Sequence, residues 1–257
     1  MQKTIVALSL VIALGCAVVA EAEEFPLRAK YPQVTTISTA ELIAQYDDVL
    51  VVDVRSSVEY EICKINSATN ILITKASFID ELTKLRAPEG EKPLVFYCNG
   101  HTCSKSYKAW VAAEKAGFGN ILCYDSGIFE WITTAADKAT LLNETPADQK
   151  KVVPKATFQA HCLEKEQFLE ACAGGDQLIF DIREPLQRKE YEGIPEARNV
   201  PFTNFVKLLK EGRLEGESLL IYDSVGKQVK WLQYRLIQHG IKEYKFLSGG
   251  ARALISE

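Results

Sequence analysis

The sequence predicts an α/β protein made of two copies of one domain, each built around a mainly parallel sheet. Apolar runs with the length of buried strands alternate with segments of helical spacing, and this alternation is typical of parallel sheets. The same order of runs then returns in the second half. The run 49–55 ends in Asp-Val-Arg, and the run 177–183 ends in Asp-Ile-Arg. Collinear repetition of this kind indicates a duplicated domain.

The first half contains a full set of such elements. Each strand is a short, continuous apolar run, which suits a strand buried on both faces. In order, the spacing predicts a helix capped by Ser38 or Thr39, a strand at 49–55, a strand-like piece at 68–73, a helix at 78–85, a strand at 93–97, a helix ending at Gly117, a strand at 121–124 and a helix at 128–133.

The second half repeats these elements with one substitution that matters for chemistry. Asp181 corresponds to Asp53 and Gly249 to Gly127, at nearly the same separation along the chain. A tyrosine followed by Asp223 corresponds to the tyrosine followed by Cys98. The second copy therefore carries a carboxylate where the first carries a thiol, and we predict that it is inactive.

Composition sets the predicted domain boundaries. Residues 136–154 are polar, contain Pro146 and Pro154, and carry charges of both signs, a composition typical of a linker. We predict a first domain at 34–135, this linker, and a second domain at 155–257.

The N-terminus predicts export. Lys3 precedes an almost wholly apolar run at 5–20, which is followed by the small-x-small pattern Ala-Glu-Ala of a signal-peptidase site. The run is short for a membrane span, which needs about 20 residues. We predict a signal peptide at 1–22, cleaved after about Ala22, and a periplasmic mature protein. An uncleaved anchor and lipidation at Cys16 remain open alternatives.

Charge and cysteine spacing bear on the partners and sites to expect. The 257 residues carry a net charge of -4 and no basic stripe, so no nucleic-acid partner is predicted. Cys98 and Cys103 lack the second Cys-x2-Cys pair that a zinc site would need, so no metal is predicted either. Cys123 lies inside an apolar run and fits a buried thiol better than a disulfide partner.

The reactive group is predicted at Cys98. An apolar strand stops at this residue, a short polar loop follows, and residues 104–107 open a helix. This order places a thiol among backbone N–H groups at a helix N-terminus, where anions bind and a thiolate is stabilised. We interpret Cys98 as a nucleophile.

Four short motifs recur in a fixed order around this loop. They are Asp-Val-Arg at 53–55, Ala-Thr-Asn-Ile at 68–71, Tyr-Cys at 97–98 and Ser-Gly at 126–127. Repeated along the chain, they resemble the tandem-domain rhodanese family of sulfurtransferases. The Cys-Asn-Gly-x-x-Cys form of the loop looks like a subgroup of exported bacterial rhodanese-like proteins. The resemblance implies two doubly wound α/β domains and a thiolate that carries a sulfane sulfur as a persulfide.

The resemblance also assigns roles to residues. Cys98 is the persulfide carrier, and Asp53 with Arg55 supports the strand end by charge pairing. Cys103, five residues from Cys98, is a possible resolving thiol. No cofactor or metal is implied, and the partners are a small sulfur donor and a thiol or protein acceptor. The loop that binds the substrate or anion consists of Asn99, Gly100, His101, Thr102, Cys103 and Ser104.

Two departures from the family pattern leave the sulfur donor open. Cys63-Lys64-Ile65 stands where the family usually has Gly-His-Ile, so a third thiol lies in a loop that can be reshaped. The Cys98 loop has no Arg or Lys to attract a dianion, and His101 is its one candidate cation. Thiosulfate, a persulfide and a polysulfide all remain candidate donors.

Other functions remain open as well. A dithiol–disulfide redox protein would use Cys98 and Cys103 together, and a non-catalytic binding module would need an unreactive Cys98. Phosphatases with this loop topology require Cys-x5-Arg, and Ser104 stands at that Arg position, so phosphate-ester chemistry is disfavoured.

Overall fold

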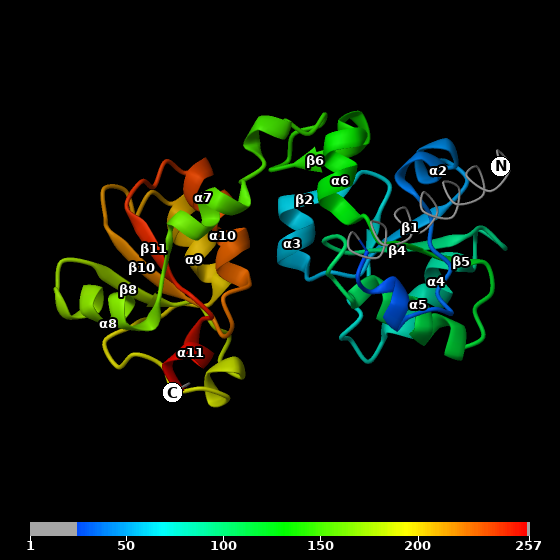
Figure 1. The fold of residues 1–257 in the computed structure, drawn as a ribbon. Coiled ribbons are helices and arrows are strands. Elements are labelled where there is room, and N and C mark those ends of the chain that lie inside the picture. Colours follow the sequence, from blue (N-terminus) through cyan, green and yellow to red (C-terminus); the bar gives the residue numbers. More distant parts are fainter. Residues whose placement is uncertain (1–24, 256–257) are drawn as a thin grey trace, which may run out of the picture. The chain divides into compact units, whose positions relative to one another are not determined.

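The computed structural model describes residues 25–255, which divide between Gln149 and Lys150 into two compact units (Figure 1). Each unit is an α/β domain with a mainly parallel sheet, as the sequence predicts. The predicted signal peptide and Cys16 lie outside the described residues. Between residues 25 and 255, no helix combines the length and apolar character that crossing a bilayer requires.

The sheet of the first unit has four parallel strands in the order β3-β1-β4-β5. Phe78 and Leu82 of α4 and Trp110 of α5 pack with Phe96 of β4 in one buried cluster, so these helices cover one face. The elements of this unit are η1 (Arg28–Lys30), α2 (Thr39–Ala44), β1 (Leu50–Asp53), α3 (Ser57–Ile62), β2 (Cys63–Ile65), β3 (Thr69–Asn70), α4 (Phe78–Arg86), β4 (Leu94–Tyr97), α5 (Lys105–Lys115), β5 (Ile121–Tyr124), α6 (Gly127–Thr134), η2 (Ala136–Lys138) and β6 (Ala139–Leu141).

Two helices of the first unit begin with a capping box. The Ser38 hydroxyl accepts the N–H of Glu41 at the start of α2, and the Glu41 carboxylate accepts the N–H of Ser38. Ser56 and Glu59 form the same pair at the start of α3. Each box satisfies backbone donors that a helix start leaves without partners. Of the two predicted caps for α2, the structure selects Ser38.

The sheet of the second unit has the same strand order when it is read from β9 to β7, with β7 as one more paired strand. Its sheet is parallel throughout, in the order β7-β11-β10-β8-β9. In the first unit a single bridge between Thr36 and Cys123 takes the place of β7, so the two sheets share one topology. Its elements are η3 (Gln149–Lys151), whose first residue ends the first unit, α7 (Lys155–Ala160), β7 (Cys162–Leu163), α8 (Lys165–Ala173), β8 (Leu178–Asp181), η4 (Gln187–Lys189), β9 (Arg198–Asn199), α9 (Phe202–Lys210), β10 (Leu219–Tyr222), α10 (Gln228–Gln238), β11 (Tyr244–Leu247) and α11 (Ala251–Ile255).

The segment after α6 does not form the linker that its polar sequence predicts. Ala139–Leu141 forms β6 and pairs antiparallel with β2, and both Ala139 and Leu141 are buried. Most of the segment at 136–149 is therefore part of the first unit rather than a linker. A strand of three residues buries too few apolar side chains to stand out from polar neighbours in the sequence.

Candidate active site

The loop after β4 carries the candidate nucleophile. β4 ends at Tyr97, and the Cys98 side chain that follows is only 1% exposed and belongs to the buried cluster. Its Sγ lies 3.1 Å from the carbonyl oxygen of Cys103 and 3.3 Å from the Oγ of Ser106. Ser106 is fully buried in the first turn of α5, so water does not compete for this contact. The predicted order of strand, loop and helix is present.

The two thiols of the loop have opposite pKa shifts. A hydrogen bond from Cys98, the backbone N–H groups of Asn99 and Lys105, and the Lys105 ammonium lower the pKa of Cys103 to about 6. Burial raises the pKa of Cys98 well above its usual value, although hydrogen bonds from Ser106 act in the opposite direction. The sequence predicts the stabilised thiolate at Cys98, whereas the geometry favours it at the half-buried Cys103.

Glycines shape the loop. Gly100 has a φ of +141°, which side chains other than glycine rarely allow. Gly127 has a φ of +71°, and a Cβ added there would lie 2.4 Å from the Gly100 nitrogen. The next residue, Ile128, donates its N–H to the carbonyl oxygen of Cys98 at 3.1 Å. The Ser-Gly motif at 126–127 thus packs directly against the loop, and a larger residue at 127 would displace it.

Arg55 holds the first residue of the loop. Its guanidinium forms a fully buried ion pair with Asp53, with 2.6 Å between Nη2 and Oδ2, so the predicted charge pairing is present. The same group donates to the carbonyl oxygen of Cys63 at 2.6 Å and to Oδ1 of Asn99 at 3.3 Å. Arg55 therefore connects the end of β1 with the loop.

Glu59 and Lys105 form a second charged contact beside the loop. The Glu59 carboxylate accepts from Asn99 Nδ2 at 2.7 Å and lies 3.1 Å from the Lys105 Nζ. Burial alone would raise the pKa of Glu59, but Lys105, Arg55 and hydrogen bonds from Asn99 and Ser56 together lower it to about 2. Lys105 is the first residue after the predicted loop, so the prediction that the loop ends at Ser104 omits this cation.

The remaining loop residues lie at its outer side. The His101 Nε2 lies 3.4 Å from the Glu130 carboxylate, and the His101 ring stacks on Phe25 with centroids 4.2 Å apart. Thr102 is exposed, and Ser104 occupies the N-cap of α5 without a hydrogen bond from its hydroxyl to the helix. The predicted cation His101 is thus engaged with a carboxylate.

The other cysteines of the first unit are buried. Within residues 25–255 all six cysteines are free thiols, and no three His, Cys, Asp or Glu residues are grouped as a metal site requires. Cys123 is buried in β5, and burial raises its pKa, as its apolar surroundings predict. Cys63 is buried behind Arg55, whose Nη1 lies 3.7 Å from its sulfur, and burial raises its pKa as well.

Comparison with known proteins assigns the fold to a family. The family model described as a rhodanese-like domain matches residues 38–134 and again residues 164–257, once in each unit. Together the two matches cover most of the chain. The chain belongs to the rhodanese-like domain family. No curated protein matches it.

Solved structures with weak similarity include proteins that carry sulfurtransferase names. The thiosulfate sulfurtransferase of Pseudomonas aeruginosa is 18% identical, with 91% of this chain and 46% of that chain covered and a TM-score of 0.39. A human single-domain sulfurtransferase is 24% identical over 39% of this chain and 97% of its own, with a TM-score of 0.33. An uncharacterised protein of Saccharomyces cerevisiae is 25% identical over 42% and 98%, with a TM-score of 0.33. The family assignment depends on the domain matches alone.

The second rhodanese-like domain has a loop that its own side chain fills. Asp223, at the position of Cys98, accepts the N–H groups of Val225 and Val229 at 2.9 and 3.1 Å, and also those of Gly226 and Gln228. Backbone donors of this loop therefore converge on an anionic group, as the resemblance implies for the first domain. In the second domain that group is a carboxylate, which cannot carry a persulfide.

Proposed function

We propose that this protein is a sulfurtransferase that carries sulfane sulfur on Cys98 of its first domain. One observation carries the proposal. Cys98 directly follows β4 of a rhodanese-like domain, its Sγ donates to the carbonyl oxygen of Cys103 at 3.1 Å, and the Cys103 thiol has a pKa lowered to about 6. The thiolate is the nucleophile of sulfur chemistry, and this pair is ionised near neutral pH.

The pair supplies the first step. The Cys103 thiolate takes the proton of Cys98, and the Cys98 thiolate attacks the outer sulfur of the donor. A bond forms between Cys98 and that sulfur, the donor's own S–S bond breaks, and the leaving group departs with the electron pair. Ser106 Oγ, 3.3 Å from Cys98 Sγ, donates to the anion while it is formed.

The persulfide then has two fates, and the variant Cys103→Ser separates them. An external thiolate attacks the outer sulfur, becomes a persulfide itself and returns Cys98 as a thiolate. Alternatively, Cys103 attacks Cys98, a disulfide forms between them and hydrosulfide leaves. Only the second fate consumes Cys103, and it requires a reductant for the next turnover.

The charges around the loop favour a donor of low charge. Three basic side chains beside the loop lie against carboxylates: Arg55 against Asp53, Lys105 against Glu59 and His101 against Glu130. A dianion such as thiosulfate would enter a region where these charges are already balanced. We therefore propose an organic persulfide, whose reacting group carries a single negative charge, as the preferred donor.

The site of action is part of the proposal. The positively charged and apolar N-terminal residues support secretion, cleavage after about Ala22 and a periplasmic location. N-terminal sequencing of the protein from a periplasmic extract should begin near residue 23. A start at Met1, or a lipid on Cys16, would contradict soluble export.

A second candidate is a dithiol–disulfide redox protein. The observation that favours it is the lowered pKa of Cys103 close to Cys98, because a low-pKa thiol beside a second thiol is also typical of disulfide exchange. In that function both cysteines would be needed equally, and no sulfur atom would be bound at any stage.

A kinetic assay separates the two candidates. Glutathione persulfide is the donor, a monothiol is the acceptor, and transfer is measured as the initial rate of persulfide appearing on the acceptor. Cys98→Ser should lose the transfer, and Cys162→Ser should match the parent. Cys103→Ser should retain the transfer, but its rate should level off at a higher pH than the rate of the parent. Equal losses in Cys98→Ser and Cys103→Ser would favour the redox function.

A further inference from the structure

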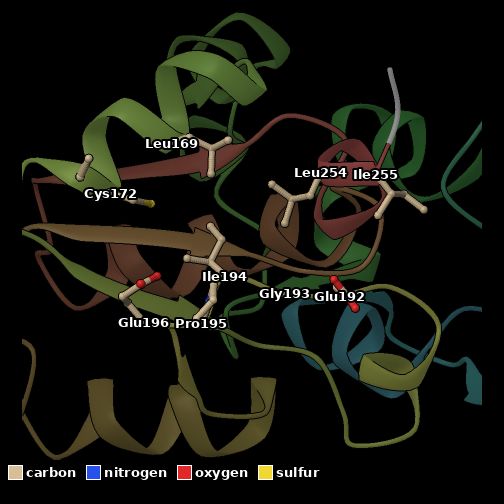
Figure 2. A pocket seen from close by; sticks show the side chains of 10 residues that line it. Leu169, Cys172, Glu192, Gly193, Ile194, Pro195, Glu196, Leu254 and Ile255 are labelled. Carbon is tan, nitrogen blue, oxygen red and sulfur yellow. The ribbon is translucent and has the colours of Figure 1, made fainter.

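A groove in the second domain is open on one side of its sheet. It has a volume of about 620 Å³ and is bounded by α8, the segment 192–196 and α11. Figure 2 shows Leu169, Ile194 and Leu254 directed into the same space from these three elements, with the Cys172 thiol beside them. Leu169 is 39% exposed, and its neighbour across the groove, Ile255, is 57% exposed. These are large apolar side chains without cover.

The equivalent place in the first domain can be located by shared hydrogen bonds. The Ile194 N–H donates to the Tyr222 hydroxyl at 3.0 Å, as the Ile65 N–H donates to the Tyr97 hydroxyl at 3.3 Å. At the start of α11, Ala251 donates to the carbonyl oxygen of Asp223, as Ile128 of α6 does to that of Cys98. Ile194 therefore corresponds to Ile65, and Leu254 corresponds to Trp131. By the same alignment Gly250, rather than the predicted Gly249, corresponds to Gly127.

The first domain covers this place with a strand of its own. β6 pairs with β2 through Ile65 and Ala139, Lys64 and Thr140, and Cys63 and Leu141. Trp131 is fully buried beside it and donates from Nε1 to the Lys138 carbonyl oxygen at 3.1 Å.

The second domain lacks both covers. Its groove has the smaller Leu254 in place of the tryptophan, and in the described part of the chain no strand pairs with the segment 192–196. The first domain fills this position with its own residues, whereas the second domain leaves it open.

We propose that the groove binds an extended segment of a partner protein, which adds to the second domain as β6 adds to the first. The backbone of 192–194 would supply strand hydrogen bonds, because Pro195 has no N–H to donate, and alternate side chains of the partner would enter the groove, as in β-strand addition. The partner segment carries large aliphatic residues, as β6 carries Leu141. It also carries a Lys or Arg, because the groove is bordered by two exposed carboxylates, Glu192 and Glu196. This role does not depend on sulfur transfer.

The probe is a synthetic peptide with the sequence of residues 137–143, Asp-Lys-Ala-Thr-Leu-Leu-Asn, which includes β6 and the preceding lysine. The readout is maleimide labelling of Cys172, which lines the groove, against Cys162, a half-buried thiol of the same domain in β7. With peptide at ten times its dissociation constant, labelling of Cys172 should slow about tenfold and that of Cys162 should not change. A peptide with aspartate in place of both leucines should give no protection.

Matched variants locate the effect. Leu254→Trp supplies the residue of the first domain and should fill the groove and abolish protection. Ile237→Trp adds the same side chain at a 48% exposed position of α10 outside the groove and should leave protection unchanged. The pair Glu192→Lys and Glu196→Lys changes only exposed residues and should weaken binding of the lysine-bearing peptide without affecting folding.

Three results would overturn the proposal. The first is no protection of Cys172 at millimolar peptide, and the second is protection that persists in Leu254→Trp while the circular dichroism of that variant matches the parent. The third is self-association of the peptide-free protein that Leu254→Trp removes, since it would assign the groove to a second copy of this chain.

Discussion

At the scale of single residues, the two loop thiols differ: Cys98 is more buried, and Cys103 loses its proton more readily. Cys98 lies in the buried cluster, where its neutral form is favoured, whereas Cys103 is half-buried among N–H donors and beside the Lys105 ammonium. The first proton lost by the pair therefore belongs mainly to Cys103. In the proposed mechanism, transfer of the Cys98 proton to Cys103 then makes the buried sulfur nucleophilic.

The lowered pKa of Cys103 predicts a pH profile. Iodoacetamide labelling of Cys103 should rise with pH and reach half its maximum near pH 6, because the thiolate is the reactive form. In Cys98→Ala the midpoint should move up toward the usual thiol value of about 8.5, because the thiolate loses its hydrogen-bond donor. An unchanged midpoint in Cys98→Ala would show that the two thiols do not share a hydrogen bond.

Glu59 predicts a loss of stability in acid. Its pKa is about 2 in the folded protein and about 4.3 in an unfolded chain, so its contribution is complete above pH 4.3 and is lost as the pH falls to 2. Guanidinium unfolding should show that the parent loses at most about 3 kcal/mol more than Glu59→Gln over this window. Glu61→Gln, exposed on the same helix, should follow the parent curve. Parallel curves for Glu59→Gln and the parent would contradict the lowered pKa.

Local sequence pattern accounts for part of this site only. Cys98, the loop and the pairing of Asp53 with Arg55 follow from motifs within short windows. The positions of Glu59 and Lys105 relative to the loop depend on how α3 packs, which no local pattern encodes. Burial also depends on packing, and for that reason the sequence does not show that Cys98 is the more buried thiol of the pair.

At the scale of elements, long apolar runs were predictable and short ones were not. The strands β1, β4 and β5 stand out because each is buried on both faces. β3 lies inside the strand-like piece predicted at 68–73, whereas β2 and β6 have three residues each, too little apolar length to be told from a loop. The linker prediction at 136–154 overlooks β6 for this reason.

β6 gives the prediction at this scale. Leu141 is 1% exposed, so Leu141→Ala should lower the free energy of unfolding of the first domain by about 2–4 kcal/mol, through lost burial and the cavity left behind. Urea unfolding followed by tryptophan fluorescence measures it. Leu186→Ala, at a 77% exposed leucine, should change stability by less than about 0.5 kcal/mol. Equal costs for the two variants would mean that β6 does not stabilise the domain.

At the scale of the whole molecule, duplication has produced two domains with different tasks. The first has the thiols Cys98 and Cys103 in its loop and covers its sheet edge with β6, whereas the second fills its loop with Asp223 and leaves the corresponding edge open. The duplication itself was predictable, because the Asp-x-Arg and Ser-Gly or Gly-Gly motifs recur at nearly constant separation. The open groove was not, since it depends on what the second copy lacks. On this ground we propose one sulfur site per chain.

The measurement that tests the central claim most directly is the intact mass of the reduced protein after incubation with glutathione persulfide. The parent should gain one sulfur atom per chain, Cys103→Ser should gain the same and retain it longer, and Cys98→Ser should gain none. Sulfur bound by Cys98→Ser would contradict the assignment of the carrier. No gain in the parent, with loss of two hydrogen atoms on mild oxidation that needs both cysteines, would contradict sulfur transfer itself.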